Sequence, residues 1–178
     1  MNTLQILRPQ DVVLCLRLSL PAGEALSNVQ LAEATGISAA ETHAGVKRLE
    51  RAKLVQRRKG QVRVLRSAFE EFLVHGVKYM FVSIQGEPTR GMPTSYAAAP
   101  LNQSLVPSGD LPPVWPDPLG EVRGLAFSPL YKSVPQAAKR DPRFYEVLAL
   151  TDALRGGRVR ERSLAEAALK EHLRDVTL

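Results

Sequence analysis

The chain has 178 residues, of which 44% are hydrophobic and 24% charged, and these proportions exclude a wholly disordered chain. This length can bury one core, or one core with a smaller satellite layer, and is short for two full domains. The formal net charge of +6 favours an anionic partner, although solubility alone is an alternative explanation.

The single cysteine, Cys15, excludes an intramolecular disulfide framework and a thiolate zinc site. We expect it to be a buried thiol in a reducing compartment. The N-terminus lacks the pattern of a secretory signal, and no apolar run approaches the roughly 18 residues that a membrane span requires. The sequence therefore predicts a cytoplasmic protein that does not enter a membrane.

Two helices are predicted at the start of the chain. The first covers residues 9–20, where Pro9 suits the first turn and apolar residues recur at helical spacing. The second is short and begins after Ser27, whose hydroxyl can cap it, and it ends at Gly36, where the next turn requires a left-handed backbone. The residues expected to face the core are Val12, Val13, Leu16, Leu20, Val29, Leu31 and Ala32.

A third helix is predicted from Ser38, because Ser38 and Glu41 form a capping-box pattern. Its expected core side carries Thr42, Val46 and Leu49. Two short strands, residues 54–57 and 61–65, then flank a turn that contains glycine, and they predict a small basic hairpin.

The residues Leu31 to Ser38 (LAEATGIS), followed by VKRLE at 46–50, resemble the winged helix-turn-helix of bacterial transcription regulators, including the MarR-like group. The resemblance covers roughly residues 10–66. It implies that the protein binds double-stranded DNA, with the third helix in the major groove and the hairpin as the wing. One departure is Lys53, which stands where many such sequences have glycine and would have to accept a strained backbone.

The resemblance also implies two classes of DNA contact. Base edges would be read by Ser38, Ala39, Ala40, His43, Ala44 and Lys47. Phosphates or the minor groove would be contacted by Arg48, Arg51, Arg57, Arg58, Lys59 and Arg63. Residues 47–66 hold nine Lys and Arg residues and one acid, a local charge of +8. A solvated helix face with a soluble hairpin tip is the alternative explanation of these charges.

The middle of the chain changes character at about residue 83. Before it, residues 67–82 predict a connecting helix, with a capping-box pattern that starts at Ser67 and apolar residues at helical spacing. Ten of the 13 prolines then fall in residues 83–135. Regular helices cannot dominate such a segment, so we expect an ordered loop wrapped over the helices, with a further strand at residues 120–127.

Candidate sites outside the helix-turn-helix are few. Arg90 and Tyr96 could form a ligand or partner surface, with Arg90 binding a carboxylate or phosphate, but a structural loop is the alternative. Residues 86–91 lack the lysine of a phosphate-binding loop. Trp115, which lies among prolines, is better explained as an anchor than as a base-stacking platform. The three histidines show no metal-ligand or nucleophile spacing, so no metal, cofactor or catalytic site is predicted.

Two helices are predicted in the C-terminal region, residues 136–178. The first starts at the pair Asp141-Pro142, a cap followed by a first-turn proline, and stops at Gly156. The second covers residues 160–173. Their apolar faces suit either a homodimer interface or binding of a protein partner, and the core of the same chain explains them nearly as well.

The sequence thus predicts a mainly α protein with a small β-hairpin. It would comprise a winged helix-turn-helix at 1–66, a connecting helix at 67–82, a proline-rich ordered loop at 83–135 and a helical region at 136–178. The expected function is that of a sequence-specific DNA-binding transcriptional regulator, most simply a homodimeric repressor, with an antitoxin-like autoregulator as one case. The alternative is a protein-interaction module that uses the same scaffold without DNA, and an enzyme ranks third.

Overall fold

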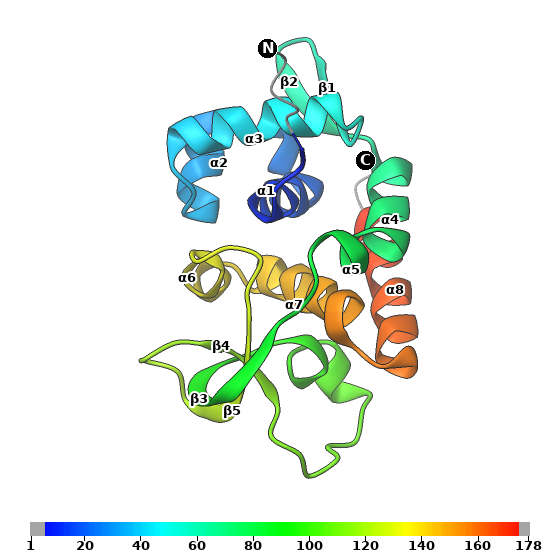
Figure 1. The fold of residues 1–178 in the computed structure, drawn as a ribbon. Coiled ribbons are helices and arrows are strands. Elements are labelled where there is room, and N and C mark those ends of the chain that lie inside the picture. The colour runs from blue at the N-terminus through cyan, green and yellow to red at the C-terminus, as the bar shows by residue number, and fades with distance from the viewer. Residues whose placement is uncertain (1–5, 175–178) are drawn as a thin grey trace.

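A computed structural model describes residues 6–174 and begins with three helices and an antiparallel hairpin (Figure 1). These elements are α1 (Pro9–Ser19), α2 (Asn28–Thr35), α3 (Ala39–Arg51), β1 (Val55–Arg58) and β2 (Gln61–Val64). A single 3₁₀ turn, Gly23–Ala25, stands between α1 and α2. The predicted order of elements in this part of the chain is confirmed.

Local capping explains where α2 and α3 begin. The hydroxyl of Ser27 accepts a hydrogen bond from the backbone N–H of Gln30 at 3.2 Å, and the backbone N–H of Ser27 donates to Oε1 of Gln30 at 2.9 Å. Gly36 ends α2 with φ of 69°, the left-handed conformation expected there. The hydroxyl of Ser38 caps α3 at 3.3 Å from the Glu41 backbone N–H. The prediction that Val29 faces the core is wrong, because this side chain is 60% exposed.

The hairpin turns through two residues of positive φ. Val55 pairs with Val64 and Arg58 with Gln61, which leaves Lys59 (φ 49°) and Gly60 (φ 81°) as the turn. Positive φ at both positions is the geometry that matches the twist of a two-residue hairpin. Lys53, just before the hairpin, also has a positive φ of 59°, so the strained backbone expected at this lysine is present.

The single connecting helix predicted for residues 67–82 is divided in the structure. Helix α4 (Arg66–His75) begins without a side-chain cap, so the capping role predicted for Ser67 is wrong, and the short α5 (Val77–Met80) follows Gly76. A Cβ at position 76 would lie only 2.9 Å from the ring of Phe72. The lower helix propensity of glycine favours a break there, and the close ring leaves no room for a larger residue.

The proline-rich segment contains a small sheet, which corrects the expectation of a segment that is mostly loop. Strands β3 (Gln85–Pro93), β4 (Pro113–Pro116) and β5 (Val122–Phe127) each pair with both of the others. Only the third strand was predicted. Pro88 follows a register shift in β3, and Pro93 ends that strand, so both prolines stand where a missing N–H is tolerated. Two short 3₁₀ turns, Ser95–Ala97 and Leu101–Gln103, lie between β3 and β4.

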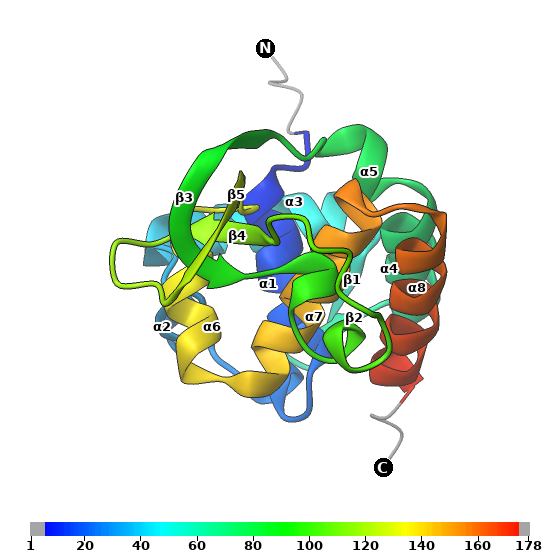
Figure 2. The ribbon, with the colours of Figure 1, turned by 90° about the horizontal axis from the view of Figure 1, so that it is seen from below.

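The C-terminal region consists of α6 (Val134–Arg140), α7 (Pro142–Gly156) and α8 (Val159–Arg174). The carboxylate of Asp141 caps α7 as predicted, 3.1 Å from the backbone N–H of Arg143. The last two helices are close to their predicted positions, whereas α6 was not predicted. Figure 1 shows α7 between the N-terminal helices and the sheet, and Figure 2 shows its central place from below.

One apolar core connects all of these elements and is built around α7. Residues 147–155 of α7 are buried without interruption, and α8 packs on α7 and α4 through Ala165, Leu169 and Leu173. The apolar faces of the C-terminal helices are therefore covered by the chain itself. The fold is mixed α/β, and within residues 6–174 no helix has both the length and the apolar composition to cross a membrane.

Candidate nucleic-acid interface

The outward face of α3 carries short side chains. Ser38, Ala39, Ala40, His43 and Lys47 are exposed, and Ala44 is half-buried. The opposite face, formed by Thr42, Val46 and Leu49, is fully buried as predicted. All six residues assigned to base readout therefore lie on accessible parts of one helix and the turn before it.

A residue of α2 adds to this face. The side-chain amide nitrogen of Asn28, which is half-buried, lies 3.4 Å from Nδ1 of the exposed His43. Asn28 was missed by the sequence interpretation because it follows the cap Ser27 and has no pattern of its own. The contact limits the orientations of the His43 ring, which is the only aromatic side chain on this face of α3.

Arg48 is not a surface residue, and this corrects its assignment to phosphate. Its side chain is 5% exposed, and its Nε and Nη2 atoms donate to the two carboxylate oxygens of Asp11 at 2.8 and 2.7 Å. These hydrogen bonds raise the pKa of Arg48, and Glu41 binds the same guanidinium. Arg48 thus joins α3 to α1, and its Nε and Nη2 atoms are occupied by the carboxylates of Asp11 and Glu41.

Glu41 completes this network at its exposed end. Burial raises the pKa of the Glu41 carboxyl, but hydrogen bonds from Arg48 and Gln10 outweigh burial and leave the pKa below its ordinary value. The packing beneath is tight, since a Cβ at Gly45 would lie 2.6 Å from Leu14 of α1. The network and this close approach together fix the orientation of α3 on α1.

The positive surface beyond α3 is smaller than the sequence count suggests. Asp11, Glu24 and Glu41, three acids from outside residues 47–66, lie within 4 Å of arginines of that segment, so +8 minus 3 leaves +5. Arg57 is also paired, with its Nε 3.1 Å from Glu50. In the described part of the chain, the exposed cations of this surface without an acidic partner are Lys47, Lys53, Arg58 and Lys59.

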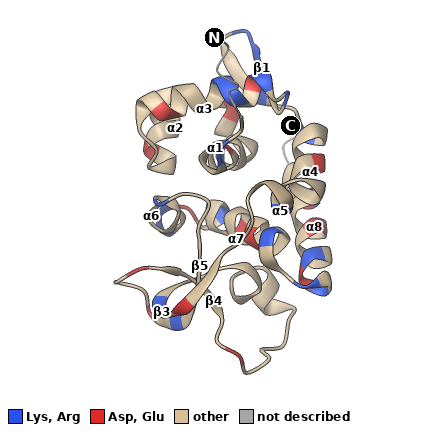
Figure 3. Ribbon diagram, viewed as in Figure 1, with Lys and Arg blue, Asp and Glu red and all other residues tan. Residues whose placement is uncertain are grey.

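The hairpin presents most of its polar side chains on one face, whereas Arg57 opposes Val62 on the other face. Gln56 opposes Arg63 and Arg58 opposes Gln61 in the register, whereas Val62 and Val64 alternate with them and are buried. A shallow concavity of about 260 Å³ is lined by Arg58, Lys59, Gln61 and Arg63. Figure 3 shows basic residues along the hairpin and the adjoining end of α3.

Arg90 and Tyr96 do not form the shared surface that was considered for them. Arg90 is exposed on β3, directly opposite Arg123 of β5. Tyr96 is half-buried in a separate cavity of about 260 Å³, formed with the loop around Leu105 and Pro107, which Arg90 does not line. Burial, with the nearby Glu161 carboxylate, raises the pKa of Tyr96.

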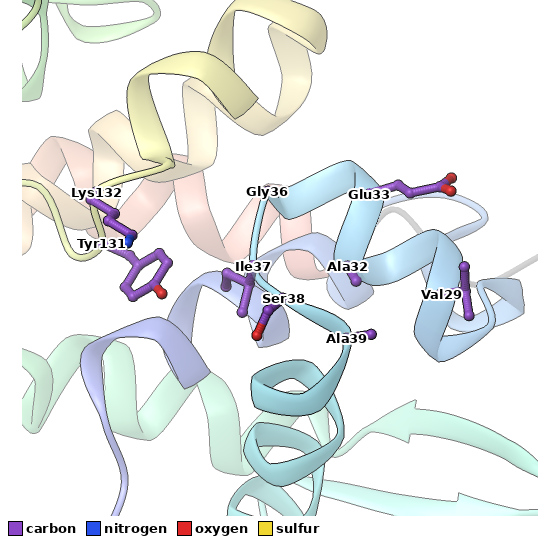
Figure 4. Close-up of a pocket in the computed structure, with 9 residues that line it drawn as sticks. All are labelled: Val29, Ala32, Glu33, Gly36, Ile37, Ser38, Ala39, Tyr131 and Lys132. Carbon is purple, nitrogen blue, oxygen red and sulfur yellow. The ribbon is translucent and has the colours of Figure 1, made fainter.

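A second concavity lies at the turn between α2 and α3 (Figure 4). It measures about 540 Å³ and joins the N-terminal helices to the loop before α6. Its lining residues are Val29, Ala32, Glu33, Gly36, Ile37, Ser38, Ala39, Tyr131 and Lys132. The start of α3 therefore shares a hollow with two residues from the second half of the chain.

Cys15 and Trp115, the other residues considered in the sequence, lie in the packed interior. Cys15 is buried, and this burial raises the pKa of its thiol, as expected for a packing residue. Trp115 is fully buried and its Nε1 donates to Asp152 at 2.7 Å, which confirms its role as an anchor. Across residues 6–174, no cluster of three or more His, Cys, Asp or Glu side chains could hold a metal ion.

Comparison of the chain with models of known protein families, with curated proteins and with solved structures finds no match.

Proposed function

We propose that residues 9–64 form a winged helix-turn-helix that binds double-stranded DNA, and that the protein regulates transcription. The observation that supports this proposal best is an exposed face of α3 that carries short side chains, with a basic hairpin beside it. Figure 1 shows α3 and the hairpin of β1 and β2 at the end of the molecule farthest from the sheet of β3, β4 and β5. The simplest form of regulation is repression, in which the bound protein covers its promoter.

Readout of bases would rest on shape and on few polar groups. Ala39 and Ala40 allow the helix to approach base edges closely and can contact thymine methyl groups. His43, oriented by Asn28, and Lys47 supply the hydrogen-bonding groups. Because this set is small, the deformability of the DNA sequence would contribute to discrimination.

Affinity would come from cations around this face. Lys47, Lys53, Arg58 and Lys59 are exposed without acidic partners in the described residues, and Arg51 is exposed at the end of α3. Each phosphate contact releases condensed counterions, so binding by such a surface weakens steeply as salt rises. Arg48 acts differently, as a positioning residue that holds α3 through Asp11.

A single reading face of this size favours two copies on one operator, so we propose a homodimer that acts in the cytoplasm. Symmetric half-sites would then be separated by about one helical turn of DNA. An antitoxin-like autoregulator, whose second half binds a protein partner, is one form of this proposal. The faces of α7 and α8 are covered by the chain's own core, so such contacts would use other surfaces.

The alternative is a protein-interaction module that does not bind DNA. An observation in its favour is a run of exposed apolar side chains around the end of α5, namely Tyr79, Met80, Val82 and Ile84. Apolar side chains grouped in this way are a common feature of protein contact sites. DNase footprinting on the DNA upstream of the coding region separates the two functions. A protected site is expected, and absence of any binding at low salt would exclude the DNA-binding proposal.

The wing is tested by removing its charges in the triple variant Arg57→Ala/Arg58→Ala/Lys59→Ala. Because Arg57 is engaged with Glu50, we expect the slope of log K against log salt to fall by about two and not three. Fluorescence anisotropy with labelled duplex at several salt concentrations measures this slope. The control Arg123→Ala/Arg158→Ala/Arg160→Ala removes the same charge from exposed positions on or beside β5 and α8 and should leave the slope unchanged. Equal slopes in the two variants would contradict the wing assignment.

A further inference from the structure

The loop before α6 is attached directly to the turn between α2 and α3. The hydroxyl of Ser133 donates to the carbonyl oxygen of Thr35 at 2.7 Å, and these residues are 98 positions apart in the chain. A Cβ at Gly36 would lie 2.9 Å from Cβ of Ser133, so the two segments are in close contact. Residues 131–133 therefore keep a fixed position beside the start of α3.

Two cations stand at this contact. Lys132 is exposed and lines the concavity that also contains Ser38 and Ala39 (Figure 4). Arg140, in the last turn of α6, is exposed, and one of its guanidinium nitrogens lies 3.8 Å from the Cβ position of Gly36. Neither side chain forms an ion pair with any acid between residues 6 and 174. Their neighbours differ, since Lys139 pairs with Asp117 and Arg17 approaches Asp141.

We propose that Lys132 and Arg140 bind the phosphate backbone of the DNA that α3 reads, so that the second half of the chain belongs to the DNA-binding surface. This inference rests on the proposed function. A major groove is about 12 Å wide and has a sugar-phosphate strand on each side. With the first turn of α3 in the groove, the strand beyond its N-terminal end passes the α2–α3 turn, where Lys132 forms the far wall of the concavity.

The chemistry of Lys132 and Arg140, which together form the flank of the α3 surface, predicts contacts without sequence preference. An ammonium group and a guanidinium group neutralise phosphates on any DNA sequence. Glu33, which lines the same concavity, would keep the backbone on the Lys132 side by repulsion. The flank therefore adds affinity and fixes the angle of the duplex relative to the second half, while bases are read only by α3.

The test is the double variant Lys132→Ala/Arg140→Ala, titrated by fluorescence anisotropy against a footprinted duplex and a scrambled duplex of equal length. The expected result is weaker binding to both duplexes and a salt slope reduced by about two, one for each residue. Both side chains are exposed, so the midpoint of thermal unfolding should stay at the wild-type value.

The matched control is Lys78→Ala/Arg160→Ala, which removes one lysine and one arginine from α5 and α8, across the molecule from α2 and α6 (Figure 1). This control should bind DNA with the wild-type slope of log K against log salt. A wild-type slope in the Lys132 and Arg140 variant, while the wing variant shows its reduced slope, would overturn this inference and leave the proposed function intact. Failure of the wild-type protein to bind either duplex would overturn both.

Discussion

Two charged networks hold the two halves of this molecule, and they differ in whether one of their acids reaches solvent. In the N-terminal half, Arg48 joins Asp11 and the partly exposed Glu41. In the other half, Asp152 is 1% exposed and accepts from Thr94, Trp115 and Arg155 at 2.7 Å each. The first network orients a helix whose outer face stays free, whereas the second fixes the sheet to the central helix.

The acids of the two networks respond in opposite ways to their surroundings. Burial raises the pKa of Asp152 and outweighs the charge of Arg155 and three hydrogen bonds. Burial also raises the pKa of Glu41, but there the hydrogen bonds win, and the pKa falls below its ordinary value. Glu41, at the exposed end of the first network, can therefore stay ionised at little cost, while the ionised form of Asp152 depends on its partners.

Removal of Asp152 should have the largest effect on stability. Asp152→Ala leaves the Arg155 guanidinium buried without its partner, and it leaves the Trp115 Nε1–H and the Thr94 hydroxyl without an acceptor. Breaking a buried pair in this way costs about 3–5 kcal/mol of unfolding free energy. Urea denaturation at pH 7 measures the loss. Asp152→Asn keeps an oxygen acceptor and should lose less, and a loss below about 1 kcal/mol for Asp152→Ala would contradict the role of this network.

Arg48→Ala should have the next largest effect, about 3 kcal/mol, because it leaves the Asp11 carboxylate buried without its partner. Its matched control is Arg58→Ala, which removes the same type of side chain from an exposed position on β1. Arg58→Ala should change stability by no more than about 0.5 kcal/mol but reduce the salt slope of DNA binding. A stable Arg48→Ala variant with a reduced slope would restore Arg48 to the phosphate contacts.

The shifted pKa of Glu41 predicts how pH acts on the first network. The folded pKa is lower than the unfolded value of about 4.3, so the stabilisation is complete above that value and is lost as pH falls through the folded pKa. The difference in unfolding free energy between wild type and Glu41→Gln should therefore be constant near neutral pH and shrink below about pH 4. Urea titrations at several pH values measure it, and a difference that grows toward low pH would contradict the assignment.

In both halves, local features could be predicted from the sequence and long-range contacts could not. Ser27, Gly36 and Asp141 act on residues within a few positions of themselves, so their caps and turns could be predicted from local pattern. The burial of Arg48 depends on Asp11, which precedes it by 37 residues, and no local pattern reveals that contact.

The sheet was missed for a similar reason. Strand β3 pairs with β5 across more than 30 residues, and its prolines resemble those of a loop until the register shift near Pro88 is known. The candidate DNA face could be predicted because it lies within one helix and one hairpin. Lys132 and Arg140 could not be assigned, because their position depends on contact between distant segments.

The smallest expected effect concerns the entry to the hairpin, where Lys53 has φ of 59°. A non-glycine residue in this conformation is strained, so Lys53→Gly should raise the unfolding free energy by about 0.5–1 kcal/mol. Lys53→Ala removes the same charge without relieving the strain, and it should leave stability near the wild-type value. Both variants should weaken DNA binding equally, because they lose the same phosphate contact. Urea midpoints and anisotropy titrations of the pair thus separate the backbone role of this residue from its charge, and equal stabilities would show that the wing tolerates the lysine without strain.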